Sequence, residues 1–334
     1  MAAKNRSSKR RPDLREGDAA SEPMPSRRIG GSLALPSRRR IGTFLLLCIL
    51  LIAVGVSLAQ SGRRGRGRGR GWGTTTPGVI PEDRAGVPDW KIDARFKSDV
   101  FTFVRVEYDD GAYGRGRWGG WGGYGYGRWL TDFPDSELNF SYRLQQLTSL
   151  KVNPNPISMR LTDERLCDYP FLYMIEPGSL VFREEEVPAL RHYLLNGGFL
   201  MVDDFWGDEE WDNFYREIRR VFPEPEYDPV ELELTHEIFR CVYRIKEKPQ
   251  VPSIHSWGGP GSVTWESHHF GNTRDVHFRG ISDKKNRLMV IICHNTDLGD
   301  GWEREGEDPD YFKEFSEKKS YPMGINIVTY AMTH

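Results

Sequence analysis

Three short runs of apolar residues constrain the fold of this chain more than any other feature of its sequence. They are Phe171–Ile175 (FLYMI), Phe199–Val202 (FLMV) and Leu288–Cys293 (LMVIIC). Such uninterrupted apolar runs are typical of strands that are covered on both faces of a parallel sheet. A fourth strand is expected at Phe101–Tyr108 (FTFVRVEY), where apolar and polar residues alternate.

Helical patterns separate these strands. The clearest is Asp208–Phe222, whose apolar residues recur at intervals of three and four and which Pro223 ends. Strands alternating with helices indicate an α/β fold, and right-handed crossovers place the helices on both faces of the sheet. We therefore predict three layers around a mostly parallel open sheet. The other helices are expected over Asp135–Leu150, Glu184–Asn196 and Tyr321–Thr333.

Charge divides the chain into two parts. Residues 1–73 contain 16 Lys and Arg against 4 Asp and Glu, whereas the rest contains 30 basic and 44 acidic residues. We interpret residues 1–40 as a disordered basic leader, 60–89 as a flexible linker rich in Gly and Arg, and 90–334 as the globular α/β domain. Its acidity argues against nucleic acid as a partner. Divalent cations, carbohydrate and envelope proteins are compatible with it, although the charge could serve solubility alone.

An uncharged stretch of 19 residues, Ile41–Ala59, predicts an N-terminal transmembrane helix that crosses the lipid bilayer. Arg38, Arg39 and Arg40 precede it and should stay in the cytoplasm, so the C-terminal domain is expected outside, facing the periplasm. The alternative is a signal peptide cleaved after Ala59, because Ser57-Leu58-Ala59 fits a cleavage site. The arginines within residues 62–71 could contact anionic lipid headgroups or belong to a solvated tether.

Residues 111–129 combine Gly with aromatic residues and predict a loop, either a lid that stacks on sugars or a low-complexity insert. No two of the cysteines Cys167, Cys241 and Cys293 form a C-x-x-C pair, so a zinc ribbon is not expected. Two of them could form a disulfide in an oxidising compartment, but we expect all three to be small buried side chains.

Polar residues follow each predicted strand. Open parallel sheets bind ligands outside the carboxyl ends of their strands, so these residues are candidates for a ligand-binding site. Carboxylates with an imidazole can bind a divalent cation, activate water or hold sugar hydroxyls. The candidates are Asp109, Asp110, Glu176, Asp203, Asp204, Trp206, His294 and Asn295.

The acids could also have a purely structural role as helix caps. Asp203 and Asp204 are adjacent, so their side chains should project to different sides. We expect one of them to meet the N-terminus of the helix that begins near Asp208, where its charge is favourable. The other would then be available to a ligand.

Motifs for a specific chemistry are missing from the sequence. It contains no G-x-S-x-G or G-x-C-x-G elbow, no P-loop and no dinucleotide-binding glycine motif, and His255, His268, His269 and His277 match no metal-binding pattern. We identify no cofactor apart from a compatible divalent cation. Our leading interpretation is a non-catalytic binding or interaction module of the cell envelope. The alternative is a metal-assisted hydrolase that acts on a sugar or cell-wall polymer through the strand-end carboxylates.

Four stretches together resemble the bacterial family called domain of unknown function 4159. They are DFPDSELN (132–139), LQQLTSLK (144–151), GGFLMVDDFWG (197–207) and YPMGINIVTYAMTH (321–334). The resemblance covers roughly residues 99–334 and implies the flavodoxin-like fold of class I glutamine amidotransferases and trehalose-utilisation-type proteins. Those amidotransferases need a Cys in a tight elbow and a distant His-x-Glu, and this chain has neither. The resemblance therefore implies a fold and no established activity.

Overall fold

The computed structural model describes residues 79–96, 99–111 and 127–334. The predicted leader and transmembrane segment, and most of the predicted linker and Gly/aromatic loop, lie outside these residues. Within the described part of the chain, none of the helices combines the length and apolar character needed to cross a bilayer.

Seven strands form one mixed sheet in the order β3-β1-β4-β6-β9-β8-β7. The first five are mutually parallel, and β8 and β7 continue the sheet in antiparallel fashion. A separate pair, β2 with β5, is antiparallel. The strands are β1 (Val104–Glu107), β2 (Asp109–Asp110), β3 (Ile157–Arg160), β4 (Phe171–Ile175), β5 (Leu180–Val181), β6 (Phe199–Asp203), β7 (Val230–Glu231), β8 (His277–Ser282) and β9 (Leu288–His294).

The apolar strands are buried on both faces because their side chains alternate between two cores. Phe171, Tyr173 and Ile175 belong to one core, and Leu172 and Met174 belong to the other. All five are at most 1% exposed. This two-sided burial explains why the central strands consist of uninterrupted apolar runs.

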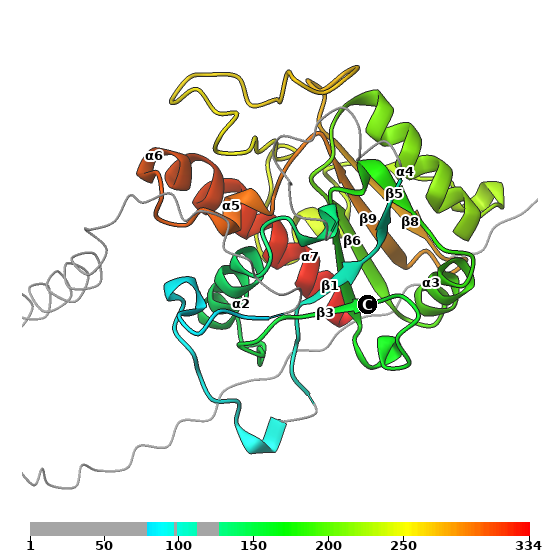
Figure 1. The fold of residues 1–334 in the computed structure, drawn as a ribbon, viewed down its shortest axis with the longest axis horizontal. Coiled ribbons are helices and arrows are strands. Elements are labelled where there is room, and N and C mark those ends of the chain that lie inside the picture. The colour runs from blue at the N-terminus through cyan, green and yellow to red at the C-terminus, as the bar shows by residue number, and fades with distance from the viewer. Residues whose placement is uncertain (1–78, 97–98, 112–126) are drawn as a thin grey trace, which may run out of the picture. The chain divides into compact units, whose positions relative to one another are not determined.

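Helices cover both faces of the sheet, as predicted (Figure 1). One core is completed by α2 and α7 with the π-helix η9, and the other by α3 and α4. The helices are α2 (Asp135–Leu147), α3 (Glu186–Leu195), α4 (Gly207–Val221), α5 (Asp300–Glu303), α6 (Pro309–Tyr311), η9 (Phe312–Ser320) and α7 (Tyr321–Thr333).

The predicted three-layer α/β architecture is confirmed, and several boundaries differ. The strand expected over Phe101–Tyr108 is confined to Val104–Glu107, and the helix expected to reach Leu150 ends at Leu147. Strands β3 and β8 were not predicted, because both mix apolar with polar residues: β3 is ISMR and β8 is HFRGIS.

The prediction that all three cysteines are buried is wrong for Cys167. Cys293 is buried in β9 and Cys241 is partly buried, but Cys167 is exposed. Cys167 lies in a short 3-10 turn, Leu166–Asp168, in which only Leu166 is buried. Within the described residues, these three thiols form no disulfide.

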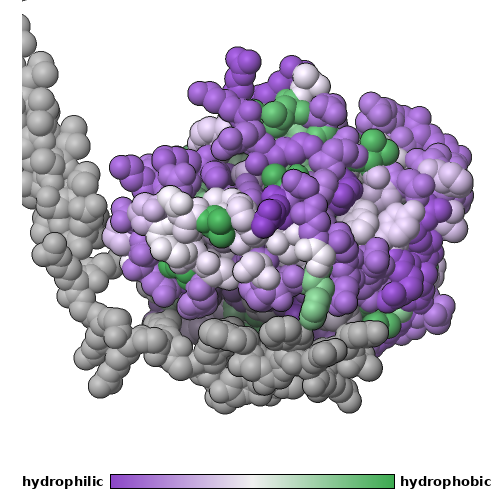
Figure 2. Space-filling view, turned by 90° about the horizontal axis from the view of Figure 1, so that it is seen from above, coloured by the Kyte–Doolittle hydropathy of each residue, from purple (hydrophilic) through white to green (hydrophobic). Residues whose placement is uncertain are grey.

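The face of the molecule drawn in Figure 2 is mostly hydrophilic among its coloured residues. Its hydrophobic residues appear singly or in small groups. This face therefore presents mostly polar side chains to solvent.

Candidate functional site

Three aspartates from loops far apart in the sequence meet at the carboxyl edge of the parallel strands. Asp132 precedes α2, Asp204 directly follows β6, and Asp297 lies in the loop after β9. Each offers one carboxylate oxygen, and these oxygens all lie within 4.8 Å of one another. Three carboxylates at such separations can bind one divalent cation.

Arg105 fixes the loop that carries Asp132. This arginine is fully buried in β1 and donates to the carbonyl oxygens of Trp129 (2.8 Å) and Thr131 (2.7 Å). Its charge is paired with the equally buried Glu137 of α2, at 2.6 Å from Nε to Oε1. A buried ion pair thus holds the backbone on the N-terminal side of Asp132.

Asp203 and Asp204 point to different sides, as expected, but neither of them caps α4. Asp203 Oδ2 accepts hydrogen bonds from the Tyr173 hydroxyl and the Gly299 N–H, both at 3.0 Å. Asp204 turns to the cluster, where the Trp206 indole N–H donates to its Oδ1 at 3.3 Å.

The N-terminus of α4 is capped by other residues. The Gly207 N–H donates to Asn295 Oδ1 at 2.8 Å, and the Trp206 N–H donates to Glu210 Oε2 at 2.8 Å. Asp208, in the first turn of α4, accepts from the Asn272 N–H at 3.0 Å. Neither Asp203 nor Asp204 therefore caps α4, although the sequence predicted this role for one of them.

A second group of acids shares Asp132 with the first. Asp132, Asp300 and Glu303 also bring carboxylate oxygens within 4.8 Å of one another. Arg304 lies against this group, with its Nε 3.5 Å from Asp300 and 2.5 Å from Glu303. The arginine compensates part of the negative charge here, whereas no basic group is paired with Asp204 among the ion pairs of the described residues.

Backbone strain is concentrated at this edge of the sheet. Asp132, Glu176, Asp204 and Asn295 have φ values of 60°, 45°, 55° and 60°, in the left-handed region that non-glycine residues rarely adopt. Strained backbone persists where the surrounding structure enforces it, and it clusters at functional sites. The strain thus marks the same loops as the carboxylates do.

The carboxylates strongly perturb one another. Burial, followed by repulsion from neighbouring acids such as Glu176, raises the pKa of Asp204 well above its usual range. Burial, followed by repulsion from Asp204, likewise raises the pKa of Asp297 well above its usual range. Burial and then Asp300 raise the pKa of Asp132 to about 7. In addition, Asp132 Oδ2 is buried and has no hydrogen-bond partner in the described part of the chain. A bound cation would satisfy this oxygen and remove the repulsion.

A histidine lies beside the cluster. The His269 ring stacks on Trp206 with the centroids 6.4 Å apart, and its Nδ1 lies 3.4 Å from Glu210 Oε1. Burial alone would lower the pKa of His269, but the carboxylates of Glu210 and Glu266 outweigh it and raise the pKa to about 9. Trp206, one of the predicted site residues, therefore links Asp204 to this histidine.

Two predicted acids make structural contacts instead. Asp109 forms ion pairs with Arg160 (2.7 Å) and Arg183 (2.6 Å). Asp110 accepts from the Arg128 N–H at 2.8 Å and from the Ser179 hydroxyl at 3.0 Å. The predicted Glu176 borders the cluster and lies 3.4 Å from the Arg128 guanidinium.

The last two predicted residues, His294 and Asn295, also have structural partners. His294 is 3% exposed, donates from Nε2 to the Gly207 carbonyl at 3.0 Å, and packs against Phe205 and Trp211. Asn295 caps α4 and donates from Nδ2 to the carbonyls of Asn272 and Asp275. These two residues brace the loops around the site without entering it.

Sequence reasoning missed most of the cluster. Asp297 and Asp300 lie only a few residues beyond the predicted strand end at His294 and Asn295, so a wider window past each strand would have included them. Asp132 lies in a loop that only the tertiary fold brings to the edge of the sheet. Nothing in its immediate sequence separates it from an ordinary loop acid.

A hollow on the molecular surface lies elsewhere. It is lined by Cys167, Tyr169, Pro170, Tyr193, Asn196, Gly197 and Gly198, at the opposite, amino-terminal edge of β4 and β6. It holds no carboxylate or imidazole, so we place the candidate site at the acidic edge.

The fold and this edge define an α/β protein with a mostly parallel sheet and an acidic site at the carboxyl ends of its strands. The family model described as "Domain of unknown function (DUF4159)" matches residues 102–332, and the chain belongs to this family. A comparison with curated proteins found no match.

Proposed function

We propose that the domain is a divalent-cation-dependent hydrolase whose cation is held by Asp132, Asp204 and Asp297. The observation that carries the proposal is the convergence of these carboxylates within 4.8 Å, with Asp132 Oδ2 buried and unpartnered. Proteins hold charges at such a density only when they are protonated, paired or bound to a cation. Among the ion pairs of the described residues, none involves Asp132, Asp204 or Asp297, whereas Asp109 on the same edge is paired with two arginines.

The donor set favours a hard cation. All three ligands are carboxylate oxygens, which suit Mg²⁺, Ca²⁺ and Mn²⁺ better than softer metals. Such a cation would polarise a substrate oxygen and lower the pKa of a bound water. Other residues would hold the ligands in place. Arg105 binds the backbone of the loop that carries Asp132. Tyr173 and Gly299 donate to Asp203, the neighbour of Asp204.

Two further features support this location. The parallel strands, numbered along the chain, follow the order 2-1-3-4-5, which is the order of a flavodoxin-like sheet. In such sheets the ligand crevice lies where the strand order reverses, here between β1 and β4. Glu176 directly follows β4, and Asp132 lies in the connection between β1 and α2. The flavodoxin-like assignment is thus supported by topology, while the amidotransferase chemistry lacks its residues.

The substrate class follows from charge. The acidic edge would repel polyanions, whereas a neutral sugar or cell-wall polymer can offer hydroxyl oxygens to the cation. The non-catalytic envelope module remains the second candidate, because a cation can also hold a carbohydrate without cleaving it.

We further propose that this domain is anchored in the cytoplasmic membrane by residues 41–59 and works outside the cytoplasm. The support is the uncharged run and the arginines before it. Protease added to spheroplasts should digest the domain, whereas its protection, with digestion of the leader, would reverse the topology.

Equilibrium dialysis of the full chain against Mg²⁺, Ca²⁺ and Mn²⁺ tests the cation site. We expect binding of one cation per chain, weakened at least tenfold in Asp204→Asn and Asp132→Asn. Asp109→Asn is the matched control, since Asp109 lies on the same edge but is paired with two arginines. Equal binding by Asp204→Asn and the wild type would overturn the proposal. An assay for reducing ends distinguishes the two candidates. A hydrolase should release reducing ends from envelope polysaccharide, and chelation should abolish this release, whereas a binding module should release none.

A further inference from the structure

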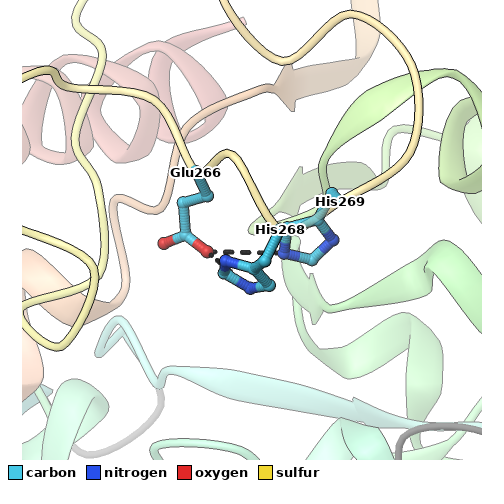
Figure 3. A group of neighbouring side chains, drawn as sticks. All are labelled: Glu266, His268 and His269. Carbon is cyan, nitrogen blue, oxygen red and sulfur yellow. Dashed lines mark ion pairs between the residues drawn. The ribbon is translucent and has the colours of Figure 1, made fainter.

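Glu266, His268 and His269 form a second cluster, distinct from the three aspartates. All three lie on the long segment between β7 and β8, and Figure 3 shows both imidazole rings turned toward one oxygen of the glutamate. Glu266 Oε2 lies 3.4 Å from His268 Nε2 and 3.4 Å from His269 Nε2. The donor atoms of the trio lie within 4.8 Å of one another.

These separations match those between two ligands of one metal ion. Donor atoms placed about 2.0–2.1 Å from a tetrahedral ion lie about 3.3–3.4 Å from one another. The two imidazole nitrogens therefore lie at the distance from the carboxylate oxygen that ligation of one zinc-like ion requires.

The carboxylate is oriented by a contact behind it. Glu266 is only 5% exposed, and its other oxygen, Oε1, accepts from the Ser253 N–H at 2.7 Å. This bond occupies one oxygen and directs Oε2 at the two imidazoles. A buried carboxylate held in this way has little freedom to turn away.

The second ring nitrogen of His269 also has the partner expected of a metal ligand. Its Nδ1 lies 3.4 Å from Glu210 Oε1, and Glu210 is itself held by the Trp206 N–H (2.8 Å) and the Arg128 guanidinium (3.2 Å). A carboxylate behind a ligating histidine fixes the ring and its tautomer. Ser253 and Glu210 thus support two of the three ligands independently of each other.

We propose that Glu266, His268 and His269 bind one Zn²⁺-class ion, with a fourth position open to water. The side chain of His268 is 53% exposed, so the cluster can be reached from solvent at this residue. Two imidazoles and one carboxylate suit zinc, whereas the three aspartates suit a hard cation. The two sites share no ligand, so each can fail its test without the other.

Zinc titration of the full chain against a competing chelator tests the site. We expect one Zn²⁺ per chain in the wild type, and at least a hundredfold weaker binding in His269→Ala and Glu266→Ala. His268→Cys should retain binding, because a thiolate also ligates zinc. Glu210→Gln should weaken binding about 10–100-fold, since it removes only the supporting carboxylate.

His192→Ala is the matched control, because His192 is exposed on α3 with Asn196 as its partner. Circular dichroism of each variant checks that the fold is kept. Replacement of zinc by Co²⁺ should give the visible absorption of a four-coordinate ion. Wild-type zinc affinity in a folded His268→Ala/His269→Ala variant, or no zinc binding by the wild type, would overturn the inference. Loss of zinc binding in Asp204→Asn, with the His variants unaffected, would assign the zinc to the aspartates and contradict it as well.

Discussion

Replacing Arg105 with Met should destabilise the domain and weaken cation binding together. Both Arg105 and Glu137 have fully buried side chains, so Arg105→Met leaves the Glu137 carboxylate in the core with the Ser136 hydroxyl as its remaining partner. Breaking a buried pair from one side costs about 3–5 kcal/mol. The carbonyls of Trp129 and Thr131 also lose their donor, and the Asp132 loop loses its anchor.

The double variant Arg105→Met/Glu137→Met separates the two effects. Replacing both charges with apolar side chains removes the unpaired carboxylate, so part of the stability should return, although the carbonyls of Trp129 and Thr131 still lack their donor. Cation affinity should stay low, because the anchor of the Asp132 loop is still missing. Urea unfolding and equilibrium dialysis measure the two quantities on the same samples.

A surface arginine provides the control. Arg165 pairs with Asp163 at an exposed position, so Arg165→Met should leave the urea midpoint and cation affinity unchanged. If Arg105→Met unfolds within about 1 kcal/mol of the wild type, the buried pair does not hold the loop. If the double variant binds cations as tightly as the wild type, Arg105 does not position Asp132.

Three further predictions concern other parts of the fold. Burial lowers the pKa of His294 from 6.5 to about 3. The domain should therefore lose stability as pH falls below 6.5, by about 2 kcal/mol at pH 5. In urea unfolding, His294→Gln should remove this part of the pH dependence. Gly207→Ala should cost about 1–3 kcal/mol in the same assay, because φ is +76° and a Cβ would lie 2.1 Å from the Phe270 carbonyl oxygen; an unchanged midpoint would refute it. In variants that each retain one cysteine, Cys167 should react with maleimide in the native chain, whereas Cys293 should react only after unfolding.

The layers of the fold could be predicted because they follow from local patterns. A strand covered on both faces must be apolar throughout, so Phe171–Ile175 and Leu288–Cys293 were recognisable without any tertiary information. Strand β8 could not be recognised in this way, because it lies near the antiparallel edge of the sheet and carries His277 and Arg279 among its apolar residues. Edge strands are less fully buried, and their composition is correspondingly mixed.

The candidate site could be predicted only in part. The rule that ligands bind at the carboxyl ends of parallel strands led to Asp203 and Asp204, and Asp204 does lie in the aspartate cluster. The rule could not exclude Asp109, because its two arginine partners come from distant segments. Nor could it find Asp132, whose loop reaches the edge through the buried contacts of Arg105.

The histidine cluster could not be predicted by periodicity. His268 and His269 lie on a segment without regular strands or α-helices, where neither the helical nor the strand period applies. Their partner Glu266 is close in sequence, but the supporting Glu210 lies on α4. Spacing alone therefore could not separate the pair from an ordinary surface loop.

Anomalous diffraction from crystals of the full chain soaked in Mn²⁺ tests the proposed cation site most directly. Manganese prefers the same oxygen ligands as magnesium and scatters anomalously. We predict one strong peak within about 2.6 Å of carboxylate oxygens of Asp132, Asp204 and Asp297. A map without a peak among these three aspartates, or with its strongest peak beside Asp109, would contradict the assignment.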